Sequence, residues 1–161
     1  MNNVMVIDDE SIWTELDLNL GAPKGNRSQH PHGDVVKTTG RILVVDDEPD
    51  IVFLIKKRLT NAGYEVSVAM DGAGATRIAM QTCPDVVLLD IGMPCGDGHM
   101  VADRIRSNPN TCFTPIIYLT ARTSDEDRER ATAAGAFAYI TKPFASDELL
   151  AQVRQAISYW R

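Results

Sequence analysis

The sequence predicts a doubly wound α/β domain built on a five-stranded parallel sheet. Five short apolar runs recur between residues 41 and 161, and segments with helical periodicity separate them. Strands that alternate with helices are typical of a parallel sheet, and mostly continuous apolar runs are expected where helices cover both of its faces. The second run alternates with Ser67 and is therefore a candidate edge strand. The predicted strands are residues 42–45, 66–69, 86–89, 116–119 and 136–140.

The helices are predicted from apolar spacing and from signals at their ends. Between Ile51 and Leu59, apolar residues recur every three or four positions and so share one face of the first helix. Pro49 suits its first turn and Gly63 its end. A Ser-x-x-Asp capping box at 124–127 starts the fourth helix, and Ser146 is the expected N-cap of the fifth.

Composition disfavours several functional classes. The 161 residues carry a net charge of −6, which disfavours direct nucleic-acid binding because that activity needs a basic patch. No apolar run approaches the roughly 18 residues that span a bilayer. The N-terminus lacks the basic region of a signal peptide, and the three cysteines include no C-x-x-C pair. We therefore expect a cytoplasmic protein without a membrane partner.

Polar residues follow four of the predicted strands. The acidic run 46–48 follows the first strand, Asp90 the third and Thr120 the fourth, while Tyr139 and Lys142 come at the end of the fifth. Parallel strands bring these ends to one edge of the sheet, which is where ligands bind in such folds.

The residue types at this edge indicate phosphoryl-transfer chemistry. Clustered carboxylates raise one another's pKa values or bind a cation, and hard oxygen ligands favour Mg2+ or Ca2+. A lysine and a hydroxyl group beside them can bind phosphate oxygens. An aspartate nucleophile would complete the site. A simpler interpretation, in which Asp46 and Asp47 only cap the first helix, leaves Asp90 and Lys142 as coincidences.

Short motifs mark the strand ends in a fixed order along the chain. They are Val45-Asp46-Asp47-Glu48, Asp71-Gly72, Leu89-Asp90-x-x-Met93-Pro94, Asp97-Gly98, Leu119-Thr120-Ala121, Gly135-Ala136 and Lys142-Pro143-Phe144. With these motifs, residues 41–160 resemble the receiver domain of two-component response regulators, the flavodoxin-like family that includes the chemotaxis regulator. The resemblance implies a strand order of 2-1-3-4-5.

The resemblance also implies a role for each matching residue. Asp90 would accept the phosphoryl group. Asp47, Asp90 and the backbone carbonyl of Gly92 would bind Mg2+ directly, and Asp46 would hold the ion through water. Lys142 would pair with the phosphoryl group. Gly92 lacks the side chain that often influences hydrolysis at this position, so the lifetime of the phosphorylated state stays open.

The implied output is a change of shape rather than substrate turnover. Thr120 would move toward the phosphoryl group and Tyr139 would swing inward, although a half-buried core tyrosine is an alternative. The Lys142–Pro143 peptide bond would be cis. The surface formed by the fourth helix, the fifth strand and the fifth helix would control binding to a downstream protein and could support a homodimer. The phosphoryl donor would be a sensor histidine kinase or a phosphotransfer protein. Apart from self-catalysed phosphorylation and dephosphorylation, no enzymatic activity is expected.

The first forty residues are predicted to be a tail or linker, with residues 41–161 as the receiver domain. The segment VMVIDDE at 4–10 imitates ILVVDDE at 42–48, but no second set of strands follows it. Three interpretations stay open: a disordered tail, an added edge strand, or a docking peptide. The apolar anchors of a docking peptide would be Ile12, Trp13, Leu16, Leu18 and Leu20.

Several functional classes also stay open. The chain ends soon after the fifth predicted helix, which favours a stand-alone receiver that acts by protein contact. A phosphorelay intermediate would look the same, and the chain could be the receiver part of a transcription factor or effector enzyme. A non-phosphorylated interaction module is disfavoured by the intact set of Asp90, Thr120 and Lys142. A small-molecule phosphatase is disfavoured because Ile91 and Gly92 supply no second catalytic acid.

Overall fold

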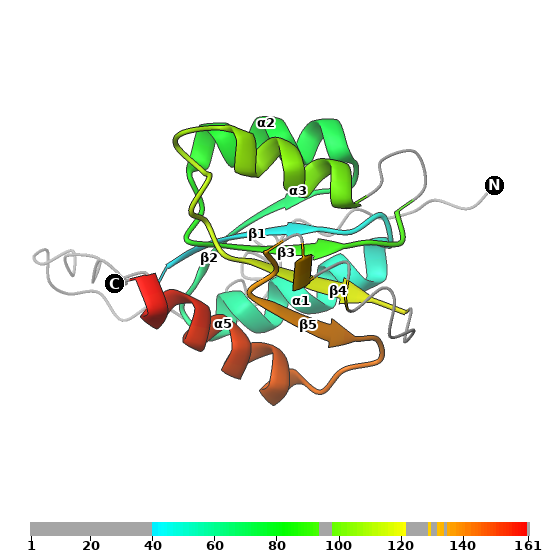
Figure 1. Cartoon of the computed structure of the whole chain (residues 1–161). Helices are drawn as coiled ribbons and strands as arrows, with labels where there is room; N and C mark the ends of the chain where they lie inside the picture. Colours follow the sequence, from blue (N-terminus) through cyan, green and yellow to red (C-terminus); the bar gives the residue numbers. More distant parts are fainter. Residues whose placement is uncertain (1–39, 94–97, 122–128, 130–131, 134, 161) are drawn as a thin grey trace, which may run out of the picture. The chain divides into compact units, whose positions relative to one another are not determined.

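A five-stranded parallel sheet organises the protein in a computed structural model, which describes residues 40–93, 98–121, 129, 132–133 and 135–160. The strand order is β2-β1-β3-β4-β5, as the sequence predicted (Figure 1). The strands are β1 (Arg41–Val45), β2 (Glu65–Ala69), β3 (Val86–Asp90), β4 (Ile116–Thr120) and β5 (Ala138–Thr141). The described helices are α1 (Pro49–Asn61), α2 (Gly72–Thr82), α3 (Gly98–Ser107) and α5 (Ser146–Trp160).

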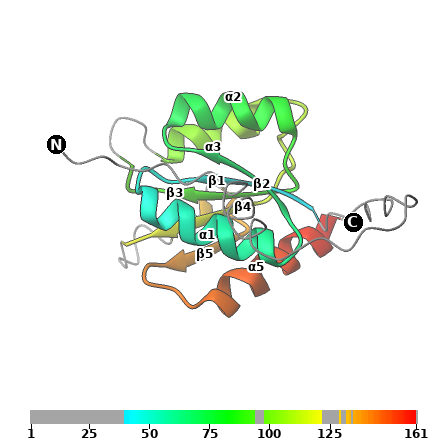
Figure 2. The same cartoon turned by 180° about the vertical axis from the view of Figure 1, so that it is seen from behind.

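The helices cover both faces of the sheet. Helices α2 and α3 lie on one face, and α1 and α5 lie on the other (Figures 1 and 2). Neighbouring residues of a strand point to opposite faces, so Leu43 and Val45 join the core beneath α2 and α3, while Ile42 and Val44 join the core beneath α1 and α5. Strands β1, β3 and β4 are almost fully buried, whereas β2 is a half-buried edge strand. The predicted doubly wound architecture and edge position are confirmed.

Helix α1 ends in a hydrogen-bonded cap that the sequence indicated. Gly63 adopts a left-handed φ of 89°, and its N–H donates to the carbonyl of Thr60. The next N–H, that of Tyr64, donates to the carbonyl of Leu59, and both of these side chains are buried in one cluster. This pair of bonds is the Schellman motif, which satisfies carbonyls that the helix itself leaves without partners. At the other end of α1, Pro49 occupies the first turn as expected.

Helix α5 begins one residue earlier than predicted. The sequence indicated Ser146 as the N-cap, but Ser146 is the first helical residue. The N–H of Leu149 donates to the carbonyl of Ala145 at 3.2 Å, so Ala145 supplies the first acceptor. The predicted cis peptide bond between Lys142 and Pro143 is present just before this helix.

Some predicted features lie outside the described residues. These are the three interpretations of the first forty residues, the capping box of the fourth helix, and the Pro94 and Asp97 positions of the motifs. Among the helices that the structure describes, none has both the length and the apolar character needed to cross a membrane.

Candidate functional site

Strand register brings the predicted site residues to one edge of the sheet. Strands β1 and β3 pair so that Asp46, directly after β1, lies beside Asp90, the last residue of β3. Thr120 ends β4 and is paired with Thr141, which ends β5 and directly precedes Lys142. Four strands therefore contribute to one site, as expected at the carboxyl ends of a parallel sheet.

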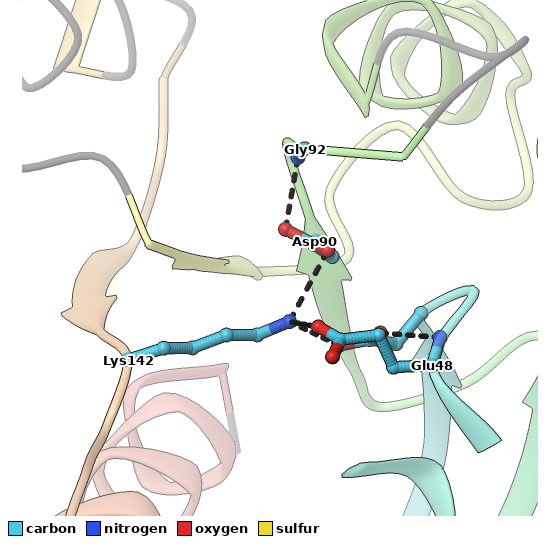
Figure 3. Close-up of polar contacts among 5 residues, drawn as sticks. Glu48, Asp90, Gly92 and Lys142 are labelled. Carbon is cyan, nitrogen blue, oxygen red and sulfur yellow. Dashed lines mark hydrogen bonds and ion pairs between the residues drawn. The ribbon is translucent and has the colours of Figure 1, made fainter. Parts of the chain in front are cut away.

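Lys142 is the centre of this site. Its Nζ atom lies 2.7 Å from an oxygen of Asp46, 3.2 Å from Asp90 and 3.2 Å from Glu48 (Figure 3). The side chains of Lys142, Asp46 and Asp90 are 11 %, 0 % and 7 % exposed, whereas that of Glu48 is 61 % exposed. Two of the three ion pairs are thus shielded from solvent, and the third lies at the surface.

Backbone hydrogen bonds orient the two buried carboxylates. Asp46 accepts the N–H of Glu48 on Oδ1 at 2.9 Å, and Asp90 accepts the N–H of Gly92 on Oδ1 at 2.8 Å. Each residue then directs its Oδ2 atom toward the ammonium of Lys142. Each carboxylate thus uses one oxygen for a backbone N–H and the other for Lys142, which fixes the orientation of both groups.

Burial and charge shift two pKa values at the site. Burial raises the pKa of Asp46 above 3.8, and this effect outweighs the hydrogen bonds from Lys142 and the Glu48 backbone, which lower it. Burial alone would lower the pKa of Lys142. The hydrogen bond and charge of Asp46, together with those of Asp90, outweigh that effect and raise the lysine pKa above 10.5. Because the neighbouring carboxylates raise the pKa of Lys142, its ammonium group keeps its proton.

The carboxylates also fit a hard divalent cation. Oxygens of Asp46, Glu48 and Asp90 lie within 4.8 Å of one another. Carboxylate oxygens are the preferred ligands of Mg2+ and Ca2+, and two of these residues are buried beside only one lysine charge. The donor set is therefore suited to the predicted ion.

Glu48 occupies this cluster where the sequence pointed to Asp47. Asp47 is half-buried beside the cluster, but its carboxylate is not among the three, and its role as a direct ligand stays a prediction. A signal for Glu48 was present in the sequence, because residues two apart in extended chain point to the same side. Asp46 and Glu48 have that spacing, and Glu48 is extended with φ −88° and ψ 107°.

Two glycines shape the surroundings of Asp90. A Cβ atom on Gly92 would lie 3.4 Å from Asp90 Oδ1, so the missing side chain leaves the acceptor open on that side. A Cβ atom on Gly98 would lie 2.5 Å from the Asp90 carbonyl oxygen, which is closer than packing allows. Glycine at 98 therefore lets α3 begin directly against the end of β3.

Thr120 is the last residue of β4, and Tyr139 lies within β5. Thr120 is fully buried, and its carbonyl accepts the N–H of Lys142 at 2.7 Å. Tyr139 is half-buried and packs on the core beneath α2 and α3, where its strand neighbour Tyr118 also lies. Strand alternation places Thr120 on the same side as Tyr118. The position of Tyr139 is compatible with both a half-buried core residue and a switch residue. Its role as a switch stays a prediction.

Comparison with known proteins assigns the family. The family model described as the response regulator receiver domain matches residues 42–154. The chain belongs to this family. The match covers β1 from Ile42 onward, the whole of β2, β3, β4 and β5, and every residue of the Lys142 cluster.

Relatives of the receiver domain include both longer and shorter proteins. The transcriptional regulatory protein KdpE of Mycobacterium tuberculosis is 45 % identical over 116 residues, which are 72 % of this chain and 50 % of that protein. The chain thus spans about half the length of that curated relative. The chemotaxis response regulator CheY4 of Vibrio cholerae superposes with a TM-score of 0.70 at 34 % identity, covering 74 % of this chain and 99 % of CheY4.

A further solved receiver domain contains a metal ion. The receiver domain of the sensor histidine kinase PA1611 from Pseudomonas aeruginosa PAO1 has a TM-score of 0.69 and 35 % identity, and the match covers 74 % of this chain and 98 % of that domain. That structure has a magnesium ion coordinated in its active-site cleft.

Proposed function

We propose that Asp90 accepts a phosphoryl group in a Mg2+-dependent reaction and that this receiver domain passes the signal on by a change of shape. The observation that carries the proposal is the position of Lys142, whose ammonium lies between the carboxylates of Asp90 and Asp46. A poorly solvated lysine at 3.2 Å from an aspartate oxygen can neutralise the charge that develops when that oxygen attacks phosphorus.

The side chains of the site divide the chemistry among them. An Asp90 oxygen forms the bond to phosphorus as the bond between phosphorus and the donor atom breaks. Lys142 binds an oxygen of the incoming group, and the hydroxyl of Thr120 offers a second donor from the end of β4. Asp47, Asp90 and the backbone carbonyl of Gly92 would hold Mg2+ directly, and Asp46 would hold it through water. The ion would offset the negative charge of carboxylate and phosphate. Gly92 leaves space beside the acceptor.

The proposed output rests on Thr120 and Tyr139. Thr120 would approach the phosphoryl group, and Tyr139 would follow into the space left behind. Binding of a downstream protein to the surface formed by the predicted fourth helix, β5 and α5 would change with this motion. The same surface is the proposed place for a homodimer. Water attack on the acyl phosphate would end the signal.

The partners follow from the family. A sensor histidine kinase or a phosphotransfer protein is the proposed donor, and the cytoplasm is the proposed location; the free thiols of Cys83 and Cys112 fit a reducing compartment. KdpE is a transcriptional regulator and the match spans half of it. That relation favours a second candidate, in which this receiver is part of a larger transcription factor or effector.

Incubation with acetyl phosphate and Mg2+, followed by intact mass measurement, tests the proposal. The wild type should gain one phosphoryl group as acetate is released, and Asp90→Asn should gain none. Asp103→Asn, which removes an exposed carboxylate on α3, is the matched control and should behave as wild type. An unmodified wild type would favour the non-phosphorylated interaction module instead.

A further inference from the structure

The three partners of Lys142 differ in one respect that matters for metal binding. Asp46 and Asp90 are buried and oriented by backbone hydrogen bonds, whereas Glu48 is largely exposed and contacts only the lysine among the described side chains. A cation bound by Asp90 Oδ2, with Asp46 Oδ2 turned toward a water of that ion, needs the same oxygens that Lys142 now contacts. Lysine and metal therefore compete for two of the three carboxylates.

Glu48 stands at a position where helix formation does not favour glutamate. It is the N-cap of α1, a place that prefers Ser, Thr, Asp or Asn, whose short side chains bond to the helix N–H groups. The Glu48 side chain makes no such capping bond. Instead its carboxylate lies 3.2 Å from Lys142 Nζ, at the solvent side of the cluster. The local structure thus leaves this carboxylate available to the lysine.

We propose that Glu48 is the positioning residue that receives Lys142 when Mg2+ takes Asp46 and Asp90. The lysine gives up its two buried partners but keeps the exposed one, so its charge is never left without a counter-ion. Lys142 then leaves Glu48 for the phosphoryl group once Asp90 is modified. This inference rests on the proposed function and extends it. It names the partner of Lys142 while Mg2+ is bound, and the order in which the lysine changes partners.

The proposal predicts different effects of Glu48→Gln on two quantities, the affinity for Mg2+ and the rate of phosphorylation. Glu48→Gln removes the receiving charge, so Mg2+ should bind about two- to fivefold more weakly, the range expected for an ion pair with an exposed member. At saturating Mg2+, the rate of phosphorylation by acetyl phosphate should not fall, because Glu48 no longer competes with the phosphoryl group for Lys142. A merely structural role would lower both quantities together.

The experiment is a Mg2+ titration by calorimetry on the full chain, with two comparisons. Asp50→Asn, an exposed acidic residue in the first turn of the same helix, makes the same change of charge without touching Lys142 and should alter Mg2+ affinity less. In a Lys142→Met background, Glu48→Gln should have no more effect than Asp50→Asn. Equal effects of Glu48→Gln and Asp50→Asn in the wild-type background would overturn the proposal. An undiminished effect of Glu48→Gln in the Lys142→Met background would also overturn it, because Glu48 would then bind the ion directly.

A second measurement covers the case in which Lys142→Met does not fold. In the NMR spectrum of the wild type, the contact between the side-chain protons of Lys142 and Glu48 should persist at saturating Mg2+. Loss of that contact on adding the ion would contradict the exchange. Failure of the proposed function is separate, because it would appear as a wild type that binds Mg2+ and shows this contact but takes no phosphoryl group from acetyl phosphate.

Discussion

Lys142 and Asp46 lie 96 positions apart in the chain, yet their charged atoms are 2.7 Å apart. The Asp46 side chain has no exposed surface, and its pKa is raised because burial disfavours the charged form. The folded state therefore depends on both members of this ion pair. Removing one leaves the other as a poorly solvated charge.

Lys142→Met should destabilise the metal-free protein by about 2 kcal/mol at neutral pH, less than for a fully buried pair because solvent reaches Glu48. The loss should shrink as the pH falls. Without the lysine the pKa of Asp46 rises further above 3.8, so the folded variant takes up a proton that the unfolded chain does not, and it gains stability relative to wild type on acidification. Urea unfolding at several pH values measures this. Lys56→Met, an exposed control on α1, should cause a small loss that does not depend on pH.

The raised pKa of Lys142 gives a separate expectation at high pH. A lysine whose folded pKa lies above 10.5 contributes its full stability below pH 10.5 and loses it as the pH rises through the folded value. Wild type should therefore lose more stability above pH 10.5 than Lys142→Met does. Parallel curves for the two proteins in that range would contradict the assigned direction.

Mg2+ should stabilise the folded protein, because the unfolded chain does not gather the carboxylates. At about 100 times the dissociation constant the gain is about 2.7 kcal/mol. The gain should be small in Asp90→Asn and should fall as the pH is lowered, since a raised Asp46 pKa lets protons compete earlier than for an ordinary aspartate. Thermal unfolding with and without Mg2+ reports both effects. An equal shift in Asp90→Asn would place the ion elsewhere.

Gly92→Val should prolong the phosphorylated state. Gly92 is exposed and does not adopt a positive φ, so a side chain can be added without backbone strain. Its Cβ would lie 3.4 Å from Asp90 Oδ1, and the branches beyond it should restrict the approach of water to the phosphoryl group. The decay of the phosphorylated mass after removal of acetyl phosphate measures the lifetime. Unchanged decay would mean that water reaches the phosphoryl group from another side.

Gly98→Ala should destabilise the protein by about 1–3 kcal/mol, the range for overpacking a tight contact. The added methyl group would meet the backbone of Asp90 and Ile91, which cannot move without shifting the acceptor. Phosphorylation of Asp90 should slow as well. Gly74→Ala is the matched control, because its methyl group would meet only the Asp71 side chain at 3.3 Å, and alanine favours the helix. Denaturant unfolding of both variants tests the difference.

The sequence by itself determined the strands, their alternation with helices and the identity of the residues at the strand ends. Continuous apolar runs predict buried parallel strands because both faces of such a sheet are covered. The end of α1 was also readable, since Gly63 suits a left-handed φ better than other residues do. These are local properties of the chain, and each needs only a short window of sequence.

Only the tertiary structure decided which carboxylates meet Lys142. The acidic run offered Asp46, Asp47 and Glu48, and the sequence favoured the first two as metal ligands without naming a partner for the lysine. The extended chain before α1 turns the first and third toward Lys142. The start of α5 at Ser146 rather than after it was decided in the same way, by where the loop from β5 supplies a carbonyl. The physical reason is that side-chain direction depends on backbone angles and on packing between distant segments, which residue identity alone does not fix.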